Sequence, residues 1–225
     1  LAGRPLSGAI DLNADGTLIT EGLSFSGTFN GTTQDLVTGE ARIDPLLAGD
    51  GSFAASLSRP SDDSIQVDDL AVATPAMSLR GDALLSMSGS NQADIAFRLN
   101  DAALLDHSLR GPISLTLGAV PAPENATDAR LRVIGPGTNL AVDTIISSPE
   151  NGYALDGEVS ARIASLATYA SLVGQPIAGS IDLSASGTAL PDLTAFDTKI
   201  SLQSEDLTIG NPTLDPLLAG TGRIN

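Results

Sequence analysis

The stretch GAIDLNADGT, at residues 8–17, carries the pattern on which most of the chain is built. Apolar and polar side chains alternate along it, in the order Ile10, Asp11, Leu12, Asn13, Ala14 and Asp15. A period of two sends successive side chains to opposite faces of a β-strand. We therefore predict a strand here, with one apolar face and one polar face in contact with water.

The same alternation recurs along the chain between turn signals rich in Gly, Pro, Asn and Asp. This combination is typical of short antiparallel strands joined by turns. It predicts an all-β fold, a long curved antiparallel sheet built from repeats. The side chains that we assign to its apolar face are Ile10, Leu12, Leu23, Phe25, Phe29, Phe53, Leu57, Ile113, Leu115, Ile181 and Leu183.

An internal repeat relates the two ends of the chain. The hexapeptide DPLLAG occurs at residues 44–49 and again at residues 215–220, an offset of 171 residues. At the same offset, LAGRPLSGAIDLNADGT aligns without a gap on LVGQPIAGSIDLSASGT. One register for two separate stretches indicates a true repeat. We predict one long β-rich unit at residues 1–171, the start of a second copy at residues 172–225, and a chain that is an excerpt of a longer array.

Helical periodicity occurs in few places. The stretch SARIASLATYASLVG predicts an amphipathic helix near residues 160–173, with Ser160 as its N-cap and Gly174 as its left-handed stop. A weaker helical turn is predicted at residues 101–107. The sheet is therefore expected to carry one or two short helices.

The repeated hexapeptide itself has the sequence of a single helical turn. Asp44 is expected to cap the first free N–H groups, Pro45 suits the first helical position, and Gly49 suits a left-handed end. The two leucines between them would then cover one end of the sheet. The predicted role of the hexapeptide is architectural.

Composition excludes several functional classes. The formal net charge is −16, the wrong sign for binding a nucleic-acid backbone. The absence of cysteine excludes disulfides, thiolate catalysis and cysteine-ligated metals. No hydrolase, phosphate-binding or dinucleotide-binding motif is present, and His107, the single histidine, is expected in a turn. We predict that the protein is not an enzyme and has no cofactor.

One stretch imitates half of a calcium-binding loop. Asp11, Asn13 and Asp15 stand at ligand positions 1, 3 and 5, followed by Gly16. However, Gly22 stands where a bidentate glutamate is needed, and the second copy has serine in place of Asn13 and Asp15. We interpret this stretch as a solvated strand face and predict no metal site.

The apolar face allows two interpretations. It could pack against another apolar face in a sealed core, or it could remain partly open as a trough suited to acyl chains. Composition alone does not choose between these alternatives.

The chain resembles the AsmA-like/TamB family (translocation and assembly module subunit TamB) of Gram-negative bacteria, and its acidic, Ala/Gly/Thr-rich composition is most similar to that of alphaproteobacterial members. The resemblance rests on LVGQPIAGSIDL at residues 172–183, DPLLAG at residues 215–220, and their earlier copies at residues 1–12 and 44–49. It spans essentially the whole chain.

This resemblance implies a taco-like, grooved β-sheet in the periplasm, anchored in the inner membrane by a helix outside this segment. It also implies movement of phospholipid acyl chains toward the outer membrane, and an Omp85-type outer-membrane barrel protein as partner in protein assembly. The alternative that the residues leave open is a repetitive adhesin or autotransporter-type stalk with a sealed core.

Overall fold

The computed structural model describes residues 6–19, 24–61, 64–86, 91–147, 154–190 and 196–225. Within these ranges the chain forms thirteen strands: β1 (Ser7–Ile19), β2 (Ser24–Val37), β3 (Asp50–Ser61), β4 (Ser64–Ala73), β5 (Met77–Ser86), β6 (Gln92–Leu99), β7 (Ile113–Pro121), β8 (Thr127–Gly135), β9 (Thr138–Ser147), β10 (Ala154–Ile163), β11 (Ala178–Ala189), β12 (Phe196–Thr208) and β13 (Thr221–Ile224).

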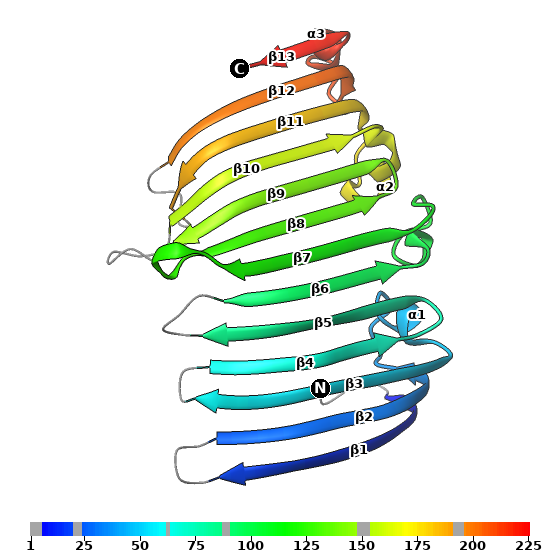
Figure 1. Ribbon diagram of the computed structural model, residues 1–225. Helices are drawn as coiled ribbons and strands as arrows, with labels where there is room; N and C mark the ends of the chain where they lie inside the picture. The colour runs from blue at the N-terminus through cyan, green and yellow to red at the C-terminus, as the bar shows by residue number, and fades with distance from the viewer. Residues whose placement is uncertain (1–5, 20–23, 62–63, 87–90, 148–153, 191–195) are drawn as a thin grey trace.

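All thirteen strands belong to one antiparallel sheet, and each strand pairs with its neighbours in the sequence. Figure 1 shows the resulting meander, a long and curved single sheet whose first and last strands lie at opposite edges. Sheets of more than about ten strands seldom stay flat and open, so curvature is expected at this size. The predicted all-β fold with a long curved antiparallel sheet is confirmed.

The described residues contain three α-helices of one turn each, α1 (Asp44–Leu47), α2 (Ala170–Val173) and α3 (Asp215–Leu218). Three short 3₁₀ turns accompany them, η1 (Ala102–Leu104), η2 (Pro123–Asn125) and η3 (Leu166–Tyr169). The helical turn predicted at residues 101–107 is η1, where Asp101 accepts a hydrogen bond from the Ala103 N–H at 3.0 Å.

The helix predicted near residues 160–173 is wrong in its first half. Strand β10 continues to Ile163, because Ser160 pairs with Ala141 and Ile163 pairs with Thr138 on the neighbouring strand. Helical structure begins only at η3 and continues into α2, which ends at Gly174 with φ of 65° as predicted. Cross-strand pairing outweighs the local helical periodicity at this point.

The hexapeptide DPLLAG forms a helical turn in both copies, but its aspartate has another role than the predicted N-cap. The Asp44 carboxylate accepts hydrogen bonds from the Thr38 N–H at 2.6 Å and the Thr38 hydroxyl at 2.8 Å. Asp215 likewise accepts from the Ile209 N–H at 2.8 Å. The bond from the Thr38 backbone is the main cause that lowers the pKa of Asp44 below its ordinary value. Each aspartate therefore ties the helical turn to the end of the preceding strand.

The two copies agree in their irregular features as well. Asp35 in β2 has φ of 44°, donates its N–H to the Gly49 carbonyl at 3.0 Å and accepts the Gly49 N–H at 3.0 Å. Asp206 in β12 has φ of 48° and makes the same two bonds with Gly220, at 2.9 and 3.1 Å. The offset of 171 residues thus corresponds to ten strands, from β1 to β11. Since ten is even, the second copy starts in the same direction as the first.

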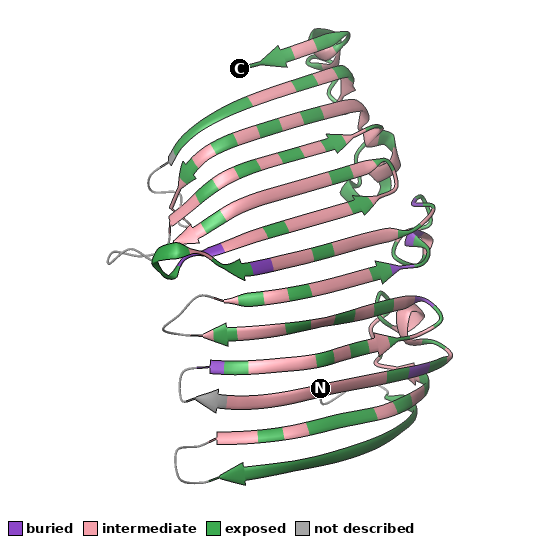
Figure 2. Ribbon diagram, in the orientation of Figure 1, coloured by how far each residue is buried: buried purple, intermediate pink, exposed green. Residues whose placement is uncertain are grey.

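The sheet is a single layer with little core. Its accessible surface is 14283 Å², whereas a compact monomer of 22.8 kDa exposes about 9,600 Å². Most strand residues are half-buried or exposed, and Figure 2 shows few buried ones. Among the described residues Leu99 is the large side chain that is fully buried, at 1% exposure.

Substitution at Leu99 tests where this small core lies. We expect Leu99→Ala to lower the free energy of unfolding by about 2–4 kcal/mol, because the cavity has little freedom to collapse. Leu85→Ala is the matched control, since Leu85 is 54% exposed and should change stability by less than about 1 kcal/mol. Urea unfolding followed by circular dichroism measures both, and equal losses would contradict the assignment.

Candidate functional site

The pairing register places apolar residues on one face along the whole sheet. Residues directly opposite each other in neighbouring strands point to the same face. One transverse row crosses all thirteen strands on this apolar face: Leu12, Gly31, Phe53, Val72, Leu79, Phe97, Leu115, Val133, Leu140, Ala161, Leu183, Leu202 and Ile224. No charged or hydrogen-bonding side chain interrupts this row, which we call the large-residue row.

The same row also shows that the repeat has no net slip. It starts at Leu12 in β1 and arrives at Leu183 in β11, which is the repeat equivalent of Leu12. A slip by one residue would send every apolar side chain to the other face. The register therefore keeps the same face apolar from one copy into the next.

A second row on the apolar face consists mostly of small residues. From β1 to β12 it runs through Gly16, Gly27, Leu57, Val67, Ala83, Ala93, Ala119, Ala129, Thr144, Gly157, Gly187 and Thr198. In most strands, bulky side chains thus cover one part of the apolar face and small ones another, with Gly31, Leu57 and Val67 as exceptions.

An aromatic ring occupies the space at one glycine of these rows and lies beside another. A side chain at Gly31 would collide with the Phe53 ring and with the Asp11 carbonyl oxygen. The place for a side chain at Gly27 lies 3.6 Å from the Phe29 ring. The Phe53 ring therefore occupies the space that a side chain at Gly31 would need, whereas the Phe29 ring lies at an ordinary contact distance from the corresponding place at Gly27.

Ten of the eleven side chains assigned to this face from the sequence lie on it, in strands β1, β2, β3, β7 and β11. Leu23 lies outside the described residues. The set of side chains assigned from the sequence did not include Leu79, Phe97 and Leu202. Their alternation with neighbouring polar residues could have identified them.

A β-bulge in β4 hides part of the pattern from the sequence. Between Val67 and Leu70 the strand contains one residue more than β5, and Asp69 there has φ of 53°. The Asp82 carboxylate accepts the Asp69 N–H at 2.8 Å. Because of the extra residue, Val67 and Leu70 share the apolar face although strict alternation would separate them.

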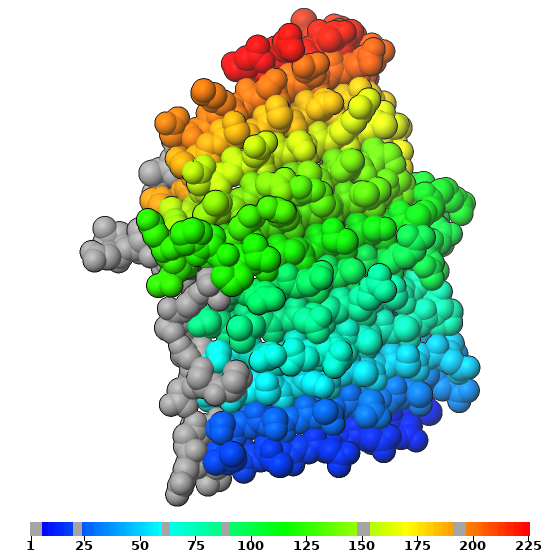
Figure 3. Space-filling model, in the orientation of Figure 1, coloured from blue at the N-terminus to red at the C-terminus, as the bar shows by residue number. Residues whose placement is uncertain are grey.

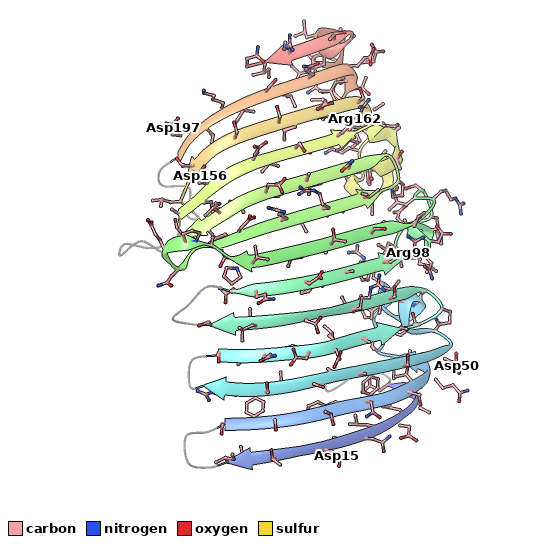
Figure 4. The ribbon with its side chains drawn as sticks, viewed as in Figure 1. Asp15, Asp50, Arg98, Asp156, Arg162 and Asp197 are labelled. Carbon is pink, nitrogen blue, oxygen red and sulfur yellow. The ribbon has the colours of Figure 1, made fainter. Side chains whose placement is uncertain are left out.

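The opposite face is polar and charged. Figure 4 shows its charged side chains spread over the sheet, from Asp15 in β1 to Asp197 in β12. The Arg132 Nη2 lies 2.6 and 2.7 Å from the two carboxylate oxygens of Asp143 on the adjacent strand. Arg130 pairs with Asp128 at 3.0 Å. Such exposed ion pairs contribute little to stability, but their charges favour contact of this face with water.

The calcium-like residues belong to this polar face. Asp11, Asn13 and Asp15 alternate along the extended strand β1, so neighbouring ones are about 7 Å apart. Strand geometry does not wrap them around one ion as a calcium loop does. In the described part of the chain, no group of three or more His, Asp or Glu side chains could hold a metal ion.

Helical turns form a lip along one side of the sheet. We define the lip as the connections at residues 38–49, 100–112, 164–177 and 209–220, which Figure 1 shows at the same ends of their strands. Leu109 in the lip is buried, and so is Leu99 at the end of β6, which lies on the apolar face opposite Ile113. The lip therefore covers the end of the apolar face at this position.

The lip also contacts the apolar face through Tyr169. Its hydroxyl donates to the Pro136 carbonyl at 2.9 Å and lies 2.6 Å from the Thr138 hydroxyl. Thr138 pairs with Ile163, whose row continues to Ile181 on the apolar face. The connection between β10 and β11 is thereby held against the end of β8 and β9.

Asp106 joins two parts of the lip that are distant in sequence. Its carboxylate accepts hydrogen bonds from the Ser108 hydroxyl at 2.6 Å, the Ser108 N–H at 2.8 Å and the Ser171 hydroxyl at 2.9 Å. These bonds, the Ser108 hydroxyl foremost, lower the pKa of Asp106 below its ordinary value. His107 lies in the same turn, as predicted.

Away from the lip, the apolar face is open within the described residues. Ile10 is 59% exposed, Leu12 56% and Ile200 50%. No second sheet covers them, because the thirteen strands form one layer. Figure 3 shows one face of the sheet, over which the strands follow each other in sequence order from the N-terminal to the C-terminal end. The geometry offers a long apolar surface with a lip on one side, and no constellation for covalent chemistry is found in the described ranges.

Comparison of the chain with protein-family models, curated proteins and solved structures found no match. Among the residues that the structure describes, no helix is both long and apolar enough to cross a bilayer.

The Asp106 cluster predicts a pH dependence. A carboxylate whose pKa lies lower in the folded state stabilises the fold above its ordinary pKa of 3.8, and this contribution is lost as the pH falls through the lower folded value. We expect Asp106→Asn to lower the melting temperature at pH 6, and the difference from the wild type to shrink below pH ~4. Melting curves between pH 2 and 7 measure this, with Asp11→Asn as a control on an exposed strand. A difference that stays constant with pH would contradict the assignment.

Proposed function

We propose that this chain is a non-enzymatic segment of a periplasmic envelope protein that offers its apolar β-groove to phospholipid acyl chains. The observation that carries the proposal is the large-residue row, which crosses thirteen strands without a polar side chain. Exposed apolar surface on this scale is rare in a soluble monomer and marks a binding surface.

The apolar face suits acyl chains better than it suits a small polar ligand. Thirteen strands at a spacing of about 4.8 Å extend the surface over roughly 58 Å. Burial of each methylene contributes about 0.8 kcal/mol wherever along the surface it occurs. Because leucine, valine, phenylalanine and alanine succeed each other, no single position binds much more strongly than the next. Chains can then shift along the surface without crossing a deep minimum.

The resemblance to the AsmA-like/TamB family supports the biological setting of this proposal. On that basis the full protein is anchored in the inner membrane by a helix outside this segment and extends through the periplasm. The same resemblance supports an Omp85-type barrel protein as partner in the assembly of outer-membrane proteins. The lipid role requires no cofactor and no catalytic residue.

The alternative, an adhesin or autotransporter-type stalk, requires a sealed core. A sealed core needs a second apolar layer over the first. The described residues provide one layer and a lip, with Ile10, Leu12 and Ile200 exposed. We therefore favour the groove, and the experiment below includes the result expected for a stalk.

Photocrosslinking at neighbouring positions separates the two functions. We expect benzoylphenylalanine at Leu12 or Phe29 to capture phospholipid in cells, since both positions lie on the apolar face. Asn13 and Asn30 are matched controls, because they lie next to these positions but on the polar face. Mass spectrometry of the adducts is the measurement. Capture of protein alone at Leu12 and Phe29 would favour the sealed stalk.

A charge in the middle of the large-residue row should interrupt the surface. We expect Leu115→Glu to weaken binding of a fluorescent phospholipid by about tenfold or more, because a carboxylate must be desolvated when a chain passes it. Thr116→Glu is the matched control on the opposite face of β7 and should leave binding nearly unchanged. Similar losses in both variants would argue against the apolar face as the binding surface. Circular dichroism of both variants checks that they fold.

A further inference from the structure

Arg59 places a charged side chain on the apolar face. It follows Ser58, which lies on the polar face opposite Ser26 in β2 and opposite Gln66 in β4. Successive side chains of a strand point to opposite faces, so the Arg59 side chain lies on the apolar face. Within the described strands, the paired residues that form the rows of this face are otherwise uncharged. Arg59 therefore differs in kind from the surface around it.

A β-bulge accompanies Arg59. Between Ser58 and Ser61, β3 contains one residue more than β4, so Arg59 and the residue after it both stand opposite Ile65. Ile65 in turn pairs with Leu85 in β5, in a row of the apolar face. Bulges are frequent beside functional sites, where they re-aim a side chain or end the pairing of a strand. The pairing thus agrees with the alternation in placing Arg59 on this face.

The surroundings of Arg59 are apolar and open. Phe25 and Ile65 lie at the same level in the neighbouring strands, and Leu57 is the preceding residue on the same face of β3. Ile65 is 44% exposed, and Leu85 in the next strand is 54% exposed. An arginine can lay its methylene stem along such a surface and keep its guanidinium group in water. A cation and exposed apolar side chains therefore stand together here.

This part of the apolar face lies away from the lip. The lip connection at residues 38–49 leads into the start of β3, whereas Arg59 lies near the other end of the strand, at Ser61. Figure 1 shows these two ends of β3 on opposite sides of the sheet. A molecule with a polar head and apolar chains can thus place its head at this open side and direct its chains toward the lip.

The chemistry and the length suit a phospholipid. The planar guanidinium group donates paired hydrogen bonds to phosphate oxygens. One leaflet contributes half of the ~30 Å hydrocarbon core of a bilayer, so an acyl chain spans about 15 Å. Along β3, the distance from Arg59 to Phe53 is roughly 20 Å at about 3.3 Å per residue. A chain that begins at Arg59 therefore passes Leu57 and Ala55 and ends near Phe53, before the lip.

We propose that Arg59 binds the phosphate of a phospholipid whose acyl chains lie along β3 on the apolar face. This inference rests on the proposed function and adds the position of the headgroup and the direction of the chains. The chains gain similar free energy at many places on the apolar face, whereas the phosphate gains a cationic partner at Arg59. Arg59 therefore gives a nearly uniform surface a preferred position for a phospholipid.

Two lipids that differ in the headgroup test the role of Arg59. Short-chain phosphatidylglycerol and the diacylglycerol with the same acyl chains are titrated separately into the intact chain by calorimetry. We expect the wild type to bind the phospholipid about tenfold more tightly than the diacylglycerol, because hydrogen bonds to a charged group are strong. Arg59→Gln should bind both lipids with nearly equal affinity. Arg59→Lys should keep part of the preference, since it keeps the charge without the planar fork.

Arg80→Gln is the matched control. Arg80 lies on the polar face opposite Ala96, so its loss should leave both affinities nearly unchanged. A preference for phosphatidylglycerol that is as large in Arg59→Gln as in the wild type would overturn the role of Arg59 and leave the apolar face as the lipid surface. Failure of the wild type to bind either lipid would instead contradict the proposed function, and this inference with it.

Inorganic phosphate separates a lipid headgroup from a free anion. We expect it to displace phosphatidylglycerol only at far higher concentration than an unlabelled phospholipid does, because it has no acyl chains to bury. Equal competition by inorganic phosphate and by phospholipid would overturn the assignment to a lipid.

A nitroxide on the lipid tests the direction of the chains in the wild type, so this measurement does not depend on the folding of a variant. A nitroxide at the end of an acyl chain should broaden the amide signals of Phe53 and Ala55 more than that of Ile65. A nitroxide on the headgroup should broaden the signals of Arg59 and Ile65 most. The reverse pattern, or equal broadening along β3, contradicts the proposed placement.

Discussion

The structure depends on the register of antiparallel pairing from one strand to the next. Each strand has an apolar and a polar side, and a shift by one residue would exchange them. In this chain the row that starts at Leu12 meets Leu183 after ten strands without a slip. The sheet can therefore continue through repeats with one apolar face, although the described residues form no second layer against that face.

In a single layer of this kind, each strand has to be stabilised mainly by the strands before and after it in the sequence. Cross-strand contacts, the backbone ladder and the lip replace the deep core of a sandwich. Buried side chains occur both at the lip, as at Leu99 and Leu109, and at the opposite strand ends, as at Ala119 and Thr127, while Ile10 and Ile200 near the two ends of the sheet are exposed. The bonds of Asp44 and Asp215 fix the lip to the strand before it in both copies. These local hydrogen bonds hold the lip while the rest of the apolar face stays open. The proposed lipid role needs this open face.

The sequence by itself determined the strands, their two faces and the internal repeat. Alternation at Ile10 to Asp15 is a local property, because a period of two has one geometric meaning in an extended chain.

Residues 160–163 show a limit of prediction from local periodicity, since a helical periodicity there gives way to pairing with β9. The bulge at Asp69 shows another, because an extra residue changes the phase of alternation and only pairing reveals it. Asp44 is of a residue type that commonly caps helices, but its carboxylate accepts a hydrogen bond from the Thr38 N–H, and the sequence pattern did not predict this contact.

The sequence also left a sealed core and an open groove as alternatives. Only the tertiary structure decided that the described strands form one curved layer, because the arrangement of apolar faces in space depends on contacts that are distant along the chain.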